Sequence, residues 1–128
     1  MVSYWEQSSA YAQGRIAVNI PQPHDQEGLS HKPFQIAASG VAMAHLNRRG
    51  LEKCFTLGEE VEVFLTPAEA CETIARLLRN NARREALAAA ARRRLEREHT
   101  WAHRLIEMFS IAGLDLTLFQ REAHVAPE

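Results

Sequence analysis

The sequence is poor in the features that mark secreted, membrane-spanning and metal-binding proteins. Its 128 residues include two cysteines, Cys54 and Cys71, which lack the CxxC spacing of a zinc framework. No apolar run approaches the roughly 18 residues of a transmembrane helix, and the N-terminal stretch lacks the basic start and apolar core of a signal peptide. We therefore expect a reduced, cytoplasmic protein with both thiols buried.

An excess of charge of one sign is also missing. The 15 basic and 16 acidic residues leave a net charge of −1, so no overall field attracts nucleic acid or an anionic membrane. The distribution is uneven, because 52–72 is acidic and 76–104 is basic. The arginine-rich stretch 83–97 lacks interleaved aromatic residues, which favours a solvated face or an interface over a nucleic-acid-binding surface.

Helix and strand patterns alternate along the first half of the chain. The patterns predict strands at 16–20, 41–44 and 61–65, separated by helices, and further helices over 2–13, 67–79, 82–98 and 101–112. This alternation predicts right-handed crossovers and a parallel sheet, hence an α/β fold with a helical C-terminal part. A complete doubly wound nucleotide fold has about five or six strands, so three strands indicate a partial Rossmann-like sheet. We expect one domain over 1–113 and a tail over 114–128.

The stretch 27–45 carries the strongest local signals. Ser30 suits a helix N-cap, Pro33 suits the first turn that follows, and Gly40 suits a left-handed residue after the helix. Because Lys32 stands at this helix start, just after Gly28, the stretch predicts an anion site, with phosphate as the expected ligand.

Further along the chain, helix boundaries are also marked. Thr66, Pro67 and Glu69 have the spacing of an N-cap followed by a helix start. The pair Asn80-Asn81 then predicts a break between two helices.

Several short motifs follow one another along about three quarters of the chain. They are Tyr11 before the strand 16–20, Gly28, the run 32–40 (KPFQIAASG), Gly50-Leu51-Glu52, Phe55, the run 58–61 (GEEV), Pro67-Ala68-Glu69, and Glu98-His99-Thr100-Trp101 with His103-Arg104. In this order the chain resembles the distal half of the donor-binding domain of GT-B-class glycosyltransferases. It is most similar to the group 1 family and its spore-maturation-like branch.

The resemblance implies a function. It implies a glycosyltransferase that uses a nucleotide-linked sugar, UDP-type by expectation, with no cofactor, no required metal and an unknown acceptor. It also implies that the family's acceptor domain and first donor half-domain are missing here, so we expect this chain alone to be inactive. Partners would then be a nucleotide sugar and these missing parts, or a second copy in a homodimer. The alternative is a non-catalytic protein-interaction module descended from such a domain.

The resemblance also assigns roles to residues. Two acids stand eight positions apart in the family, and Glu27 and Gln35 occupy this spacing here. Gln35 would accept hydrogen bonds from the donor ribose, Glu27 would lie near the sugar as the catalytic candidate, and Lys32 would contact phosphate. A neutral acceptor in place of a carboxylate loses about 1 kcal/mol, roughly fivefold in affinity. Gly28, Pro33 and Phe34 complete the expected donor-binding set.

Simpler interpretations of the same residues stay open. Without the resemblance, Lys32 is a solvated cation, Gln35 a polar helix residue and Glu27 an ordinary loop acid. His31 and His45 could approach a donor, although single histidines near a sheet are more often structural. His99 and His103 have the spacing of a zinc pair, but no HExxH pattern joins them, so a helix junction explains them better.

The strand 16–20 raises a separate expectation. It is apolar and uncharged and has no proline, as in a buried central strand, yet no other strand precedes it in this chain. Natural sheet edges are blunted with charge, proline or a bulge. We therefore expect this edge to be covered by a second copy or by the helix 2–13.

Overall fold

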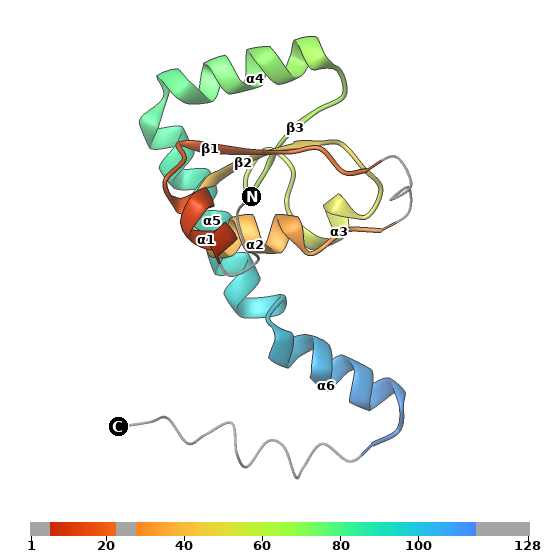
Figure 1. Ribbon diagram of the computed structural model, residues 1–128. Coiled ribbons are helices and arrows are strands. Elements are labelled where there is room, and N and C mark those ends of the chain that lie inside the picture. Colours follow the sequence, from red (N-terminus) through yellow and green to blue (C-terminus); the bar gives the residue numbers. More distant parts are fainter. Residues whose placement is uncertain (1–5, 23–27, 115–128) are drawn as a thin grey trace, which may run out of the picture.

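The protein is a three-stranded parallel sheet packed between helices, with a long C-terminal helix that projects away from the sheet (Figure 1). The computed structural model describes residues 6–22 and 28–114. Its elements, in chain order, are α1 (Gln7–Ala12), β1 (Ile16–Asn19), α2 (Lys32–Ala38), β2 (Ala42–Leu46), α3 (Leu51–Cys54), β3 (Glu62–Phe64), α4 (Pro67–Arg79), α5 (Asn81–Glu98) and α6 (Trp101–Ile111). The predicted α/β class and the three parallel strands are confirmed.

The strands lie in the order β1-β2-β3, so that β2 is central and β1 forms one edge. Val18 lies opposite Ala44, and Ala44 lies opposite Glu62. The middle strand begins one residue later than predicted and continues to Leu46. The extension arises because His45 and Leu46 still pair with neighbouring strands. The prediction ended the strand where the apolar residues end, but backbone pairing does not depend on an apolar side chain.

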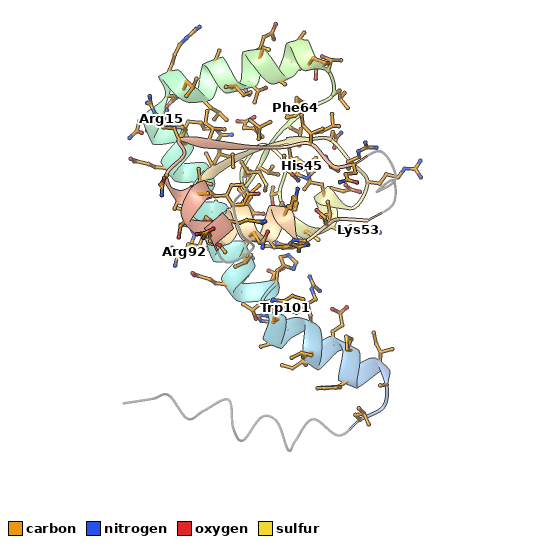
Figure 2. All side chains as sticks on the ribbon, viewed as in Figure 1. Arg15, His45, Lys53, Phe64, Arg92 and Trp101 are labelled. Atoms are coloured by element: carbon orange, nitrogen blue, oxygen red, sulfur yellow. The ribbon has the colours of Figure 1, made fainter. Side chains whose placement is uncertain are left out.

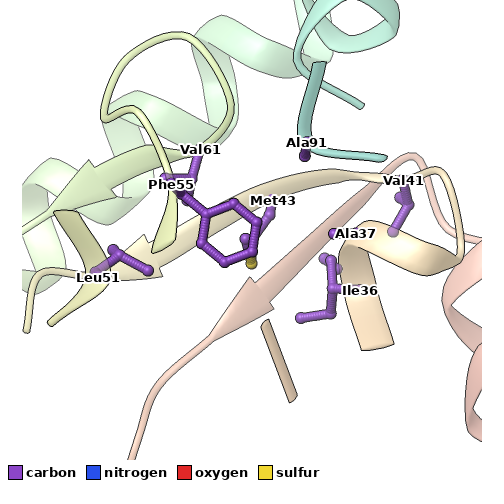
Figure 3. Packing of buried hydrophobic residues seen from close by; sticks show 9 residues of the cluster. Ile36, Ala37, Val41, Met43, Leu51, Phe55, Val61 and Ala91 are labelled. Atoms are coloured by element: carbon purple, nitrogen blue, oxygen red, sulfur yellow. The ribbon is translucent and has the colours of Figure 1, made fainter. Parts of the chain in front are cut away.

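The core has two parts, one on each face of the sheet. On the α2 face, Figure 3 shows Met43 and Phe55 packed with Ile36, and the whole cluster comprises Ala17, Ile36, Ala37, Val41, Met43, Leu51, Phe55, Val61 and Ala91. On the other face, the cluster comprises Ala42, Ala44, Phe64, Leu77 and Leu87. Because α5 supplies Leu87 to one cluster and Ala91 to the other, this single helix connects both layers.

The predicted start and break signals of the later helices are confirmed. Thr66 caps α4 by accepting a hydrogen bond from the Glu69 N–H at 3.2 Å. Asn80 ends α4 and caps α5 through its side-chain oxygen, which accepts from the Arg83 N–H at 2.9 Å. Thr100 caps α6 in the same way, together with His103.

Two local predictions are wrong. The N-cap of α2 is His31, which makes no side-chain capping bond, and Ser30 lies one residue too early for this role. Pro33 does lie in the first turn, and Gly40 has the expected left-handed conformation with φ of 68°. The thiol of Cys71 is exposed rather than buried, because α4 turns Thr73 and Leu77 toward the core and Cys71 lies off that face.

A charged network joins β3 to both helices of the second layer. The carboxylate of Glu62 lies 2.9 Å from Arg76 of α4 and 2.9 Å from Arg83 of α5, and the Glu62 side chain is only 12% exposed. Arg83 also donates to the Gly58 carbonyl in the turn before β3. One carboxylate therefore holds two helices and a turn together, and partial burial makes its hydrogen bonds stronger than those of a surface pair.

Replacing Glu62 with Gln should destabilise the fold by about 2 kcal/mol, because two arginines lose a charged acceptor. Urea unfolding followed by circular dichroism measures this change. The matched control is Glu96→Gln, which removes an exposed ion pair with Arg92 on α5 and should have a much smaller effect. Equal losses in the two variants would show that Glu62 has no special structural role.

Candidate functional site

The predicted donor-binding residues lie in and just before the first turn of α2. Lys32 is exposed, Pro33 is buried toward the core, and Phe34 and Gln35 are partly buried. Gly28 is exposed, and a Cβ added there would meet no atom of the described residues within 4 Å. The predicted catalytic candidate, Glu27, lies outside the described residues.

A cavity of about 470 Å³ lies beside this turn, between α2 and the junction of α5 with α6. Its volume falls in the range of small-molecule sites. The lining residues are Leu29, Ser30, His31, Phe34, Gln35, Ala38, Leu95, His99, Thr100, Trp101 and Arg104. The fold thus brings two predicted residues, Phe34 and Gln35, into one cavity, whereas Gly28, Lys32 and Pro33 do not line it.

Gln35 lines this cavity and also carries an unsatisfied acceptor. Its Oε1 atom is buried, and no donor within the described residues forms a hydrogen bond with it. A buried acceptor without a partner typically costs about 1–3 kcal/mol. A ligand hydroxyl would remove that cost once the Gln35 side chain rotates to bring this buried oxygen to the cavity surface.

His99 forms the link between the cavity and the core. Its ring packs against Phe34 and Phe55, with centroid distances of 5.4 Å and 6.1 Å. Its Nε2 lies 3.0 Å from the Cys54 carbonyl, and its Nδ1 lies 2.6 Å from a guanidinium nitrogen of Arg104. Since a carbonyl only accepts and a guanidinium only donates, the ring is neutral, with the proton on Nε2. Burial, with a further contribution from the Arg104 charge, lowers the pKa of His99.

The α5–α6 junction supplies the cavity wall opposite α2. The Thr100 cap starts α6 so that Trp101 and Arg104 both reach the lining. Figure 2 shows Trp101 at the start of α6, beyond the sheet. The sequence predicted a break between two helices at His99-Thr100 and gave no ligand role to Trp101 or Arg104, because their proximity to Gln35 depends on packing between distant segments.

A second polar pair lies at the carboxyl ends of β1 and β2, where ligands of parallel α/β sheets commonly bind. The Asn19 amide nitrogen lies 2.8 Å from His45 Nε2, and His45 Nδ1 lies 2.5 Å from the Leu46 carbonyl. Both side chains are buried, at 5% and 0% exposure, so His45 is held inside the sheet layer. Because the Leu46 carbonyl only accepts hydrogen bonds, Nδ1 of His45 carries the proton. Burial lowers the pKa of His45, with a smaller effect in the same direction from Arg48.

Comparison with known proteins bears on this arrangement. The model of a family described as glycosyl transferase-like matches residues 1–110. The chain belongs to this glycosyl transferase-like family. No curated protein and no solved structure matches the chain.

The match to the glycosyl transferase-like family covers every element from α1 to α6, except the last residue of α6. The cavity and every residue that lines it therefore lie inside the family domain. Membership confirms the coarser part of the resemblance, and the GT-B class and its branch stay predictions. Within 6–22 and 28–114, every helix is too short or too polar to cross a bilayer.

The neutral histidines generate a prediction about pH. The unfolded chain binds a proton at His45 near the ordinary pKa of about 6.5, whereas the folded chain resists protonation there. Stability should thus be complete above about pH 6.5 and fall as the pH drops toward the lower pKa of the folded state. Urea midpoints measured between about pH 7.5 and 5.5 report this loss. His99 contributes with the same sign.

The variant His45→Gln separates the two histidines. It should be less stable than the native chain at about pH 7.5, because Asn19 loses a well-placed acceptor, and its stability should depend less on pH. An unchanged pH slope in this variant would contradict the buried neutral state of His45.

Proposed function

We propose that this chain is the nucleotide-sugar-binding portion of a GT-B-class glycosyltransferase that transfers a sugar to an acceptor. The observation that carries the proposal is the cavity beside the first turn of α2, inside the family domain, which is lined by Gln35, an amide side chain with a buried, unpaired oxygen. A ribose offers neighbouring hydroxyl donors, which match this acceptor.

Residues around the turn supply further contacts. Lys32 is exposed there, and its ammonium group suits a phosphate. Because α2 has only seven residues, we assign this attraction to Lys32 rather than to the helix dipole. Glu27, just before the described segment, is the candidate for contact with the sugar.

One observation favours the alternative of a protein-interaction module. Helix α6 exposes large apolar side chains that no other described element covers, namely Trp101, Leu105, Ile106, Met108 and Ile111. Such a surface is typical of a site that binds another protein. A third hypothesis is that the arginine-rich helix α5 binds nucleic acid. It has less support, because five of its arginines bond to groups of the chain itself, namely Arg83, Arg84, Arg92, Arg94 and Arg97.

Titration with UDP, followed by amide NMR shifts, tests the donor proposal. Weak binding is expected, with shifts at Lys32–Gln35, and Gln35→Leu should weaken it about fivefold through loss of one hydrogen bond worth about 1 kcal/mol. Gln13→Leu, at an exposed position after α1, is the matched control and should leave binding unchanged. Shifts confined to α5 would contradict the donor site and favour the nucleic-acid hypothesis.

We further propose that the edge of β1 with which no described strand pairs binds a strand of a second copy. The strand carries no charge, and Val18 and Ile20 are 43% and 66% exposed. The described part of the N-terminal helix, α1, packs chiefly against α2, which supports a second copy over this helix as the cover of the edge. Unpaired backbone groups along such an edge favour association.

Val18→Lys should therefore weaken self-association, because a charge would lie beside the side chains of the partner strand on one face of the joined sheet. Sedimentation at several protein concentrations measures the effect, and Ser8→Lys on the exposed surface of α1 adds the same charge elsewhere. A native chain that stays monomeric at high concentration, with fast amide exchange along β1, would contradict the proposal.

A further inference from the structure

The wall of the cavity opposite α2 contains a cation that the proposed contacts do not use. Among the described residues that line the cavity, Arg104 is the one arginine or lysine. Its side chain is 42% exposed, so the guanidinium group is accessible to a ligand. Its position on α6 places this charge on the wall facing Gln35.

Arg104 is held by a neutral histidine and by an exposed carboxylate. One guanidinium nitrogen donates to His99 Nδ1 at 2.6 Å, and His99 is itself held by the Cys54 carbonyl. The other nitrogen pairs with Glu107 at 2.8 Å, but this carboxylate is 59% exposed and its attraction is therefore weak. A neutral histidine thus orients the guanidinium, and an anion in the cavity would compete with the exposed Glu107 for its charge.

The rest of the lining restricts what that anion belongs to. Phe34, Leu29 and Leu95 make one part of the wall apolar, and the Trp101 ring is exposed beside it. Gln35 requires a hydroxyl or N–H donor. A single ligand that satisfies all three features has a flat apolar ring, hydroxyl donors and an anionic group, which is the chemistry of a nucleoside diphosphate.

We propose that Arg104 binds the phosphate of a nucleoside diphosphate whose nucleoside part occupies the cavity between α2 and the α5–α6 junction. This inference rests on the proposed donor-binding function and assigns a ligand role to a segment outside the expected donor set. In this arrangement the ribose hydroxyls donate to Gln35, the base packs against Trp101 and Phe34, and His99 acts as a positioning residue for Arg104.

The test compares UDP and uridine, which differ only in the charged group. Binding to the full chain is followed by the NMR signal of the Trp101 indole N–H and by amide shifts. Arg104→Gln should weaken UDP binding about tenfold or more, because charge-assisted hydrogen bonds to phosphate are lost, while uridine binding stays unchanged. Arg93→Gln, an exposed arginine of α5 outside the cavity, is the matched control and should alter neither ligand.

The remaining outcomes separate this inference from the donor proposal. If Arg104→Gln binds UDP as well as the native chain does, while Gln35→Leu binds it less well, Arg104 has no ligand role and the donor proposal stands. Equal loss of UDP and uridine binding in Arg104→Gln would indicate a purely structural role and overturn the inference. If the native chain binds neither ligand, both proposals fail.

A second measurement does not depend on any variant. In the native chain, raising the salt concentration should weaken UDP binding and leave uridine binding nearly constant, because only the former contains an ion pair. The Trp101 indole signal should shift with both ligands. A salt-independent UDP affinity would contradict a phosphate contact with Arg104.

Discussion

The structure depends on burying the central strand β2 on both of its faces. Ala42, Met43, Ala44 and His45 are each at most 2% exposed. Because side chains alternate along a strand, Met43 and His45 point to the α2 face, and the two alanines point to the α4–α5 face. A covering layer on each side is therefore obligatory, and α2 cannot shift without uncovering β2. The rigidity of the first turn of α2, and so the position of Gln35, follows from this burial.

The small residues of α5 allow this helix to pack close to the sheet and to form the cavity beside α2. Ala88 and Ala91 are buried and let the helix pass close to the sheet layer, so that its last turns lie beside α2. At that point Leu95 and His99 face Phe34, and the space left between the helices is the cavity. A helix with larger side chains at these positions would be held farther from α2, and His99 would lose its contacts with Phe34 and Cys54.

How much was predictable from sequence depends on the range of each interaction. The boundary of α4 follows from Thr66, Pro67 and Glu69, because Thr66 accepts from the Glu69 N–H and Pro67 suits the first turn. All three lie within four residues, so a local sequence pattern is enough to predict this boundary. Ser30 was a misleading cap because several residues near a helix start can serve, and side-chain type alone does not choose between them. The cavity was not predictable, because Gln35 and Arg104 are brought together only when α5 packs against α2.

The organisation of α6 shows that the donor proposal and the interaction alternative need not compete. Trp101, Leu105 and Met108 are spaced at three and four positions and form one exposed stripe, with Arg104 and Glu107 along its side. Only Trp101 and Arg104 line the cavity, while Leu105 and Met108 do not. A helix with this spacing can contribute a cation and a ring to a ligand at its first turn and still present an apolar surface beyond it. Covering that surface with another protein would also fix the direction of α6, and with it the position of Arg104 in the cavity.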